Sequence, residues 1–159
     1  MIKKICNISS TIILIIMITI AGILLIPKIF GYETYAVLSG SMEPKFPIGS
    51  IVFVDRINPE EVKTDDIISF ILSGNGKVAT HRVIEVNSSE KQFITKGDAN
   101  EYVDTNPVNF TDLIGKVKFN VPLLGFIAIY IKTKLGIFIG VGLMLLLGVL
   151  NFLPDLLEK

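Results

Sequence analysis

The chain has 159 residues, of which 50% are hydrophobic, and its 15 basic and 15 acidic side chains leave no net charge. This length suits one domain rather than two large ones. With neither a basic excess nor a basic stripe, the composition argues against nucleic acid as a partner. A mean hydropathy of +0.62 is high for a soluble protein, so the distribution of the apolar residues becomes the first question.

Residues 1–28 are predicted to form an N-terminal transmembrane anchor. No charged residue lies between Lys4 and Lys28, and the run ISSTIILIIMITIAGILLI is about as long as the roughly 20 apolar residues that span a bilayer as a helix. The alternative is a cleavable signal peptide, because MIKK supplies a basic start. The run is longer than the usual apolar core of about 7–15 residues, however, and no A-x-A-like site follows it. The single cysteine, Cys6, excludes an intrachain disulfide.

Residues 29–134 are predicted to form a small, mostly antiparallel β domain. Five runs rich in Val, Ile and Phe have the alternation or density of strands, and turn-forming residues separate them. The runs are SIVFVDRI, DDIISFIL, VATHRVIEV, KQFITKG and LIGKVKF, beginning at residues 50, 65, 78, 91 and 113. A further apolar run, VPLLGFIAIYIK at 121–132, is too short to span a membrane; it fits an interfacial segment, a β element or a strand end.

A second charge-free run, LGIFIGVGLMLLLGVLNFLP at 135–154, is long enough for a C-terminal transmembrane helix, with residues 155–159 as a cytoplasmic tail. A buried core helix is the alternative for this run. Lys3 and Lys4 favour a cytoplasmic N-terminus, which would place the β domain outside the cell membrane.

Few residues of the middle region could do chemistry. His81 is the only histidine, and with no second histidine or cysteine there a zinc site is not expected. A carboxylate-only calcium or magnesium site stays open in GDANEYVD. Ser41 lies in the turn-forming stretch SGSMEP, and a serine nucleophile needs a base, for which histidine is suited at neutral pH. Asp98 and Asp104 follow His81 and could orient its ring.

The stretches SGSMEP, GSIVFVDR, DDIISF, THRVIEV and TKGDAN, in this order between residues 35 and 117, resemble the sequence boxes of type I signal peptidases. The resemblance is greatest to the branch of archaea, the endoplasmic reticulum and some Gram-positive bacteria. The commoner bacterial branch has a lysine as general base where this chain has His81. Lys77, four residues earlier, is a poor substitute.

The resemblance implies a signal-peptidase or LexA-like β fold and a membrane-bound serine endopeptidase that removes signal peptides from secretory preproteins. It assigns Ser41 as nucleophile, His81 as general base, Asp104 as charge-relay acid and Asp98 as supporting acid. It leaves open which of the two aspartates is the relay acid. The Ser41 N–H and the Ser39 hydroxyl would stabilise the oxyanion. The chain has GDAN where the family often has GDNN, and TDDII where a glycine often precedes DII; neither change removes a catalytic group.

The resemblance implies no cofactor and no metal, and it implies preproteins and the lipid bilayer as partners, with other membrane subunits undetermined. Small residues are expected at the first and third positions before the cut, in shallow pockets walled by Val37, Val52 and Val83. Two alternatives are a non-catalytic relative that binds or scaffolds exported proteins and a self-cleaving LexA-like regulator. Ser41, His81 and both aspartates favour an enzyme over the first alternative, and the membrane helices and the missing lysine argue against the second.

Overall fold

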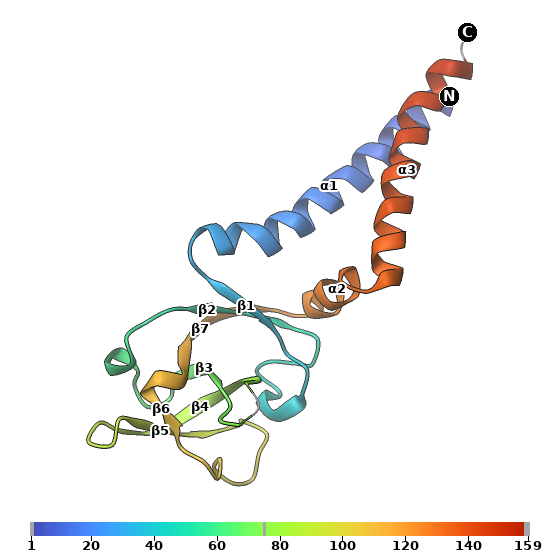
Figure 1. Ribbon diagram of the computed structural model, residues 1–159. Coiled ribbons are helices and arrows are strands. Elements are labelled where there is room, and N and C mark those ends of the chain that lie inside the picture. Colours follow the sequence, from blue (N-terminus) through green and yellow to red (C-terminus); the bar gives the residue numbers. More distant parts are fainter. Residues whose placement is uncertain (1, 75, 158–159) are drawn as a thin grey trace. The chain divides into compact units, whose positions relative to one another are not determined.

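The computed structural model describes residues 2–74 and 76–157, which form two compact units. The first, the sheet unit, comprises residues 27–126. The second, the helical unit, contains the chain up to Ile26 together with the chain from Ile127 onward. The strands labelled β1 to β7 in Figure 1 all belong to the sheet unit.

Helix α1 (Ile2–Ile29) is the predicted N-terminal apolar helix. Its side chains are mostly exposed, and it is long and apolar enough to cross a membrane. It ends where the sequence supplies a glycine with φ of 87°, Gly31, a backbone conformation that glycine adopts without strain. The N–H groups of Gly31 and Tyr32 cap the last carbonyls, those of Lys28 and Pro27.

The sheet unit is built on a single seven-stranded antiparallel sheet with the strand order β1-β2-β7-β3-β4-β5-β6. Its strands are β1 (Glu33–Ala36), β2 (Ile51–Asp55), β3 (Ile67–Ile71), β4 (Val78–Asn87), β5 (Gln92–Lys96), β6 (Val108–Asn109) and β7 (Leu113–Val121). Short 3-10 turns η1 (Gly40–Met42), η2 (Pro59–Glu61) and η3 (Phe110–Asp112) interrupt the connections.

The sheet is curled into a half-barrel. Register shifts between Phe53 and Val54, Ser69 and Phe70, and Val83 and Glu85 mark the irregular points in its ladders, and such bulges increase bending and twist. Two buried apolar clusters fill it. One contains Val62, Ile68, Phe70, Val83, Phe93 and Val108, and the other Met42, Phe46, Val52, Val54 and Ile67. The predicted mainly β fold between two long apolar helices is therefore confirmed.

All five predicted strand runs contain strands, as β2, β3, β4, β5 and β7. The sequence reasoning missed β1 and β6. Each is short, at four and two residues, and neither contains a run of apolar residues at a strand period. They form because β2 and β5 offer unpaired backbone groups at the edges of the sheet.

The apolar run left open at 121–132 divides into the end of β7 and a helix, α2 (Leu124–Ile131). β7 ends at Val121, and Leu123, with a positive φ of 64°, lies in the turn between this strand and α2. The start of α2 packs closely against the chain before β2, because the Gly125 N–H donates to Gly49 O at 2.8 Å. A β-carbon on Gly125 would lie only 2.6 Å from Ser50 O.

Helix α3 (Lys134–Leu157) contains the second predicted spanning run and is also long and apolar enough to cross a membrane. Within the helical unit, Ser10 of α1 lies 3.3 Å from Asn151 of α3, hydroxyl oxygen to amide oxygen, and Figure 1 shows the two helices side by side there. Of the expected tail at 155–159, residues 155–157 continue α3, and 158–159 lie outside the described residues.

Candidate active site

Ser41 lies in the turn η1 between β1 and β2, and its position is set by the residues that follow it. Met42 and Phe46 are 2% and 4% exposed and belong to the apolar cluster under β2. The Phe46 N–H donates to Met42 O, and the Glu43 N–H to Gly40 O, which closes the turn. Burial of the two apolar side chains therefore holds a short polar turn still, with the Ser41 side chain half-buried.

The loop after β5 holds the same turn from the other side. The Ala99 N–H donates to Ser41 O at 2.9 Å. Gly97 makes this approach possible, because a β-carbon at that position would be 2.6 Å from Ser41 O. Gly97, the glycine of the sequence box TKGDAN, therefore cannot be replaced by a larger residue without moving the backbone of Ser41.

His81 projects from β4 beside Ser41. The distance from His81 Nε2 to Ser41 Oγ is 3.2 Å, which is a hydrogen bond between the predicted base and the predicted nucleophile. The imidazole and the ring of Phe70 on the neighbouring strand β3 form a T-shaped pair, with ring centres 6.1 Å apart and an interplanar angle of 70°. The side chain of His81 is 14% exposed, so protein surrounds most of the ring.

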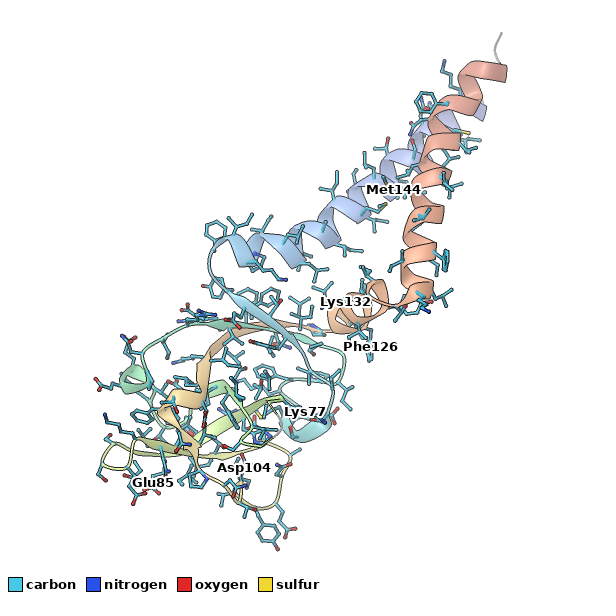
Figure 2. The ribbon with its side chains drawn as sticks, in the orientation of Figure 1. Lys77, Glu85, Asp104, Phe126, Lys132 and Met144 are labelled. Atoms are coloured by element: carbon cyan, nitrogen blue, oxygen red, sulfur yellow. The ribbon has the colours of Figure 1, made fainter. Side chains whose placement is uncertain are left out.

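Asp104 reaches the other nitrogen of the same ring. Its Oδ2 lies 2.5 Å from His81 Nδ1 and also accepts a hydrogen bond of 2.6 Å from the Thr95 hydroxyl. Figure 2 labels Asp104 in the long loop between β5 and β6, and Lys77 in the hairpin between β3 and β4. Three residues separated by 40 and 23 positions are thus joined by hydrogen bonds.

Asp98 has a different partner. Its two carboxylate oxygens accept hydrogen bonds of 2.8 and 2.7 Å from Arg82 Nε and Nη2. The third nitrogen of the same guanidinium, Nη1, donates to the backbone carbonyl of Asp65 at 2.9 Å. Hydrogen bonding to Asp98 raises the pKa of Arg82 above its ordinary value, so the guanidinium stays charged. The structure therefore separates the two predicted acids: Asp104 contacts the histidine, and Asp98 ties the loop to the next residue of β4.

Ser39 lies next to the nucleophile, with its hydroxyl oxygen 3.4 Å from Ser41 Oγ, and it is exposed. No group of three or more His, Cys, Asp or Glu side chains able to hold a metal ion occurs among residues 3–74 and 76–152, whose side chains the structure describes. The two aspartates of GDANEYVD, which had left a carboxylate site open, face Arg82 and His81 instead.

A cleft of about 670 Å³ opens beside Ser41 and His81. Residues 35–39 line one part of it and residues 77–81 another, while Met42, Phe46, Val52 and Leu72 add apolar surface. Two of the three predicted wall residues, Val37 and Val52, do line the cleft. The prediction for Val83 is wrong: its side chain is fully buried in the other apolar cluster.

Sequence reasoning missed two residues that support this arrangement, Thr95 and Arg82. Both stand in strands that were predicted, but neither residue type indicates a site by itself. Arg82 directly follows the histidine, and Thr95 lies three residues before Asp98. Only the pairing of β4 with β5, in which Val83 faces Thr95, brings them to the two aspartates.

The chain matches the signal peptidase family, peptidase S26, over residues 9–96. It is 41% identical over 86 residues to signal peptidase I W of Bacillus subtilis, which is 52% of this chain and 45% of that protein. It is 31% identical over 125 residues to the human signal peptidase complex catalytic subunit SEC11C, covering 70% of this chain and 65% of the relative. For the SEC11 subunit of Debaryomyces hansenii the identity is 36% over 131 residues, covering 75% and 76%.

The chain thus spans about half to two thirds of the length of the first two relatives. The matched residues 9–96 include Ser41 and His81 and end just before Asp98 and Asp104. His81 stands where the commoner bacterial branch has its lysine, and the similarity to the SEC11 subunits places the chain with the relatives that pair serine with histidine. The chain belongs to the peptidase S26 family of signal peptidases, in its Ser-His branch.

Proposed function

We propose that this protein is a membrane-bound serine endopeptidase that cleaves N-terminal signal peptides from exported preproteins. The observation that carries the proposal is the continuous chain of hydrogen bonds from Ser41 Oγ through the His81 ring to Asp104 Oδ2. A non-catalytic scaffold has no need for a nucleophile, a base and an orienting acid in hydrogen-bond contact beside an open cleft.

Ser41 and His81 would carry out acylation. As Ser41 Oγ attacks the scissile carbonyl carbon, its proton passes to His81 Nε2. Asp104 Oδ2 accepts the hydrogen bond from His81 Nδ1–H, which holds the tautomer that leaves Nε2 free to take the proton and stabilises the imidazolium that forms. When the C–N bond breaks, His81 returns that proton to the leaving amine, the new N-terminus of the mature protein.

Deacylation uses the same groups with water as the nucleophile. His81 Nε2 takes a proton from water, the resulting hydroxide attacks the acyl carbon, and the proton returns to Ser41 Oγ as the ester bond breaks. In both steps a negative charge develops on the carbonyl oxygen. The Ser41 N–H and the nearby Ser39 hydroxyl are the donors suited to stabilise it.

Asp98 acts as a supporting acid through Arg82 and not on the histidine. The bidentate ion pair joins the loop that begins at Gly97 to β4. Asp104 lies six residues further along that loop, so the ion pair restrains the loop that presents the relay acid.

The cleft beside Ser41 suits a signal peptide with small residues at the first and third positions before the cut. Val37, Met42 and Val52 present apolar surface to it, so larger side chains would be excluded by overlap. Preproteins that differ only at these two positions test this: alanine should be cleaved and phenylalanine rejected, and equal cleavage of both would contradict it.

The long apolar helices α1 and α3 indicate membrane anchoring. We extend this to an orientation with both ends in the cytoplasm and the domain of residues 29–134 outside, because Lys3 and Lys4 precede α1. In this division residues 1–28 and 135–154 are the membrane segments and 155–159 the tail. Protease added to wall-stripped cells should digest the domain; protection until the membrane is permeabilised would mean that the orientation is reversed.

The direct experiment is cleavage of a purified secretory preprotein by the full chain in detergent micelles, without other subunits. The wild type should release the mature protein with a new N-terminus, identified by mass spectrometry, and Ser41→Ala should not. Ser88→Ala is the matched control, because Ser88 is an exposed serine in the turn after β4. Equal cleavage by Ser41→Ala would assign the activity to a different nucleophile or a contaminating peptidase.

A further inference from the structure

The Thr95 side chain makes the most buried polar contact of the site. Thr95 lies in β5 and is 0% exposed. Its hydroxyl donates a hydrogen bond of 2.6 Å to Asp104 Oδ2, the same oxygen that lies 2.5 Å from His81 Nδ1. A single carboxylate oxygen therefore receives two hydrogen bonds, one from the histidine and one from a buried strand.

A second contact joins the same two residues through the backbone. The Asp104 N–H donates to the Thr95 carbonyl at 2.8 Å. Asp104 itself comes from a loop with little packing of its own, since every side chain from 98 to 107 is exposed or half-buried. Tyr102 and Val103, the two residues before the acid, are 75% and 50% exposed. The position of the carboxylate thus depends on Thr95 more than on apolar packing of its own loop.

We propose that Thr95 is a positioning residue for catalysis, which holds the Asp104 carboxylate in the orientation that faces His81. The inference rests on the proposed peptidase function. The hydroxyl donates to the ionised carboxylate, and a hydrogen bond to a charged group is stronger than one between two neutral groups. Without it, rotation about the side-chain bonds of Asp104 moves Oδ2 away from Nδ1, and the ring loses its orienting partner.

The residue type suits this role. Threonine is branched at the β-carbon, so its first side-chain torsion has few accessible values and the hydroxyl keeps its direction. Serine would keep the donor with more rotational freedom. Valine keeps the shape of threonine but places a methyl group, which cannot donate, against the carboxylate.

The test compares the kinetics of Thr95→Val and Thr95→Ser with wild type on one preprotein. Loss of a hydrogen bond to a charged group predicts a fall in kcat/KM of about 10- to 100-fold for Thr95→Val, and Thr95→Ser should recover most of it. The loss should lie in kcat with KM nearly unchanged, because the buried Thr95 does not line the cleft. Ser50→Ala is the matched control, since it removes another fully buried hydroxyl, bonded to Pro47 O.

A double-mutant cycle separates positioning from a general effect on folding. If Thr95 acts through Asp104, adding Thr95→Val to Asp104→Asn should lower kcat/KM by less than about twofold further. Thermal melting of each variant checks the fold. If Thr95→Val melts more than roughly 5 °C below wild type, Thr95→Ala replaces it in the cycle as a second variant without the donor.

The inference is overturned if the donor-less variants match wild type, if their effect multiplies with that of Asp104→Asn, or if Thr95→Ser is as slow as Thr95→Val. These results would leave the peptidase function intact, because wild type still cleaves and Ser41→Ala does not. A wild-type protein that fails to cleave, or a fully active Ser41→Ala, would overturn both the function and the inference.

Discussion

The turn that carries the nucleophile is held mainly by buried apolar side chains, whereas the loop that carries the acid is held mainly by hydrogen bonds. In the turn, Met42 and Phe46 are buried in the apolar core directly after Ser41. In the loop at 98–107 no side chain is buried, and hydrogen bonds hold it in place instead, from Arg82 to Asp98 and from Thr95 to Asp104. Apolar burial is strong but non-directional, whereas hydrogen bonds are weaker but set an orientation. The nucleophile needs a stable position, and the acid needs a direction toward one ring nitrogen.

The largest expected effect is at the point where the two regions meet. Ser41→Ala and His81→Ala should each lower kcat by several orders of magnitude, because neither residue can complete the proton transfer alone. The double variant should be little slower than either single one. Kinetics on a preprotein, with melting curves to confirm folding, measure this, and multiplied losses would mean that the two residues act independently.

Removing the apolar support of the turn should cost stability first. Met42→Ala leaves a cavity under Ser41 and should lower the free energy of unfolding by about 2–5 kcal/mol. Met144→Ala is the matched control, since Met144 on α3 is 62% exposed and labelled in Figure 2. Thermal melting in detergent compares them, and a similar shift for both would show that Met42 does not anchor the turn.

Removing the polar support of the loop should lower the stability less than removing Met42, but it should disturb the orientation of the Asp104 carboxylate and so lower kcat/KM. Asp98→Asn weakens the bidentate pair with Arg82 and should destabilise the protein by about 1–3 kcal/mol, with a roughly tenfold fall in kcat/KM. Glu101→Gln, an exposed change in the same loop, is the control. If Asp98→Asn were instead as inactive as Asp104→Asn, a direct role of Asp98 at the histidine would be indicated.

The smallest effect concerns the ion pair between Asp66, the residue before β3, and Lys116 of β7. Burial of Asp66 opposes its ionisation, but hydrogen bonds from the Lys116 ammonium and the Lys63 N–H outweigh this and hold the pKa below its usual value. The stabilisation is therefore full above the unfolded-state pKa of about 4 and is lost as pH falls through the lower folded-state value.

Melting curves at several pH values test this contact. The stability difference between wild type and Asp66→Asn should be greatest near neutrality and shrink below about pH 4, with preprotein cleavage at neutral pH little changed. A difference that does not depend on pH would show that the ion pair contributes nothing measurable.

Much of the fold was predictable because its signals are local. The five main strands have runs of Val, Ile and Phe, and the two long helices have uncharged apolar runs. The short edge strands β1 and β6 have no such signal, because pairing with a neighbour creates them. The run that forms α2 was also left open, and its first turn lies where the Gly125 N–H bonds Gly49 O, a residue distant in sequence.

The identity of the candidate site residues followed from residue type and order: one serine in a turn, one histidine and two aspartates after it. Which aspartate contacts the histidine could not be predicted in this way. Asp98 and Asp104 are chemically the same, and Asp104 is the one at the ring nitrogen because pairing of β4 with β5 places Thr95 beneath it and Arg82 beside Asp98. The prediction that Val83 lines the cleft was wrong because alternation along a strand identifies its two faces but not which of them faces the core. The sequence shows which chemical groups are present, but contacts between strands that are distant in sequence decide which way a carboxylate points.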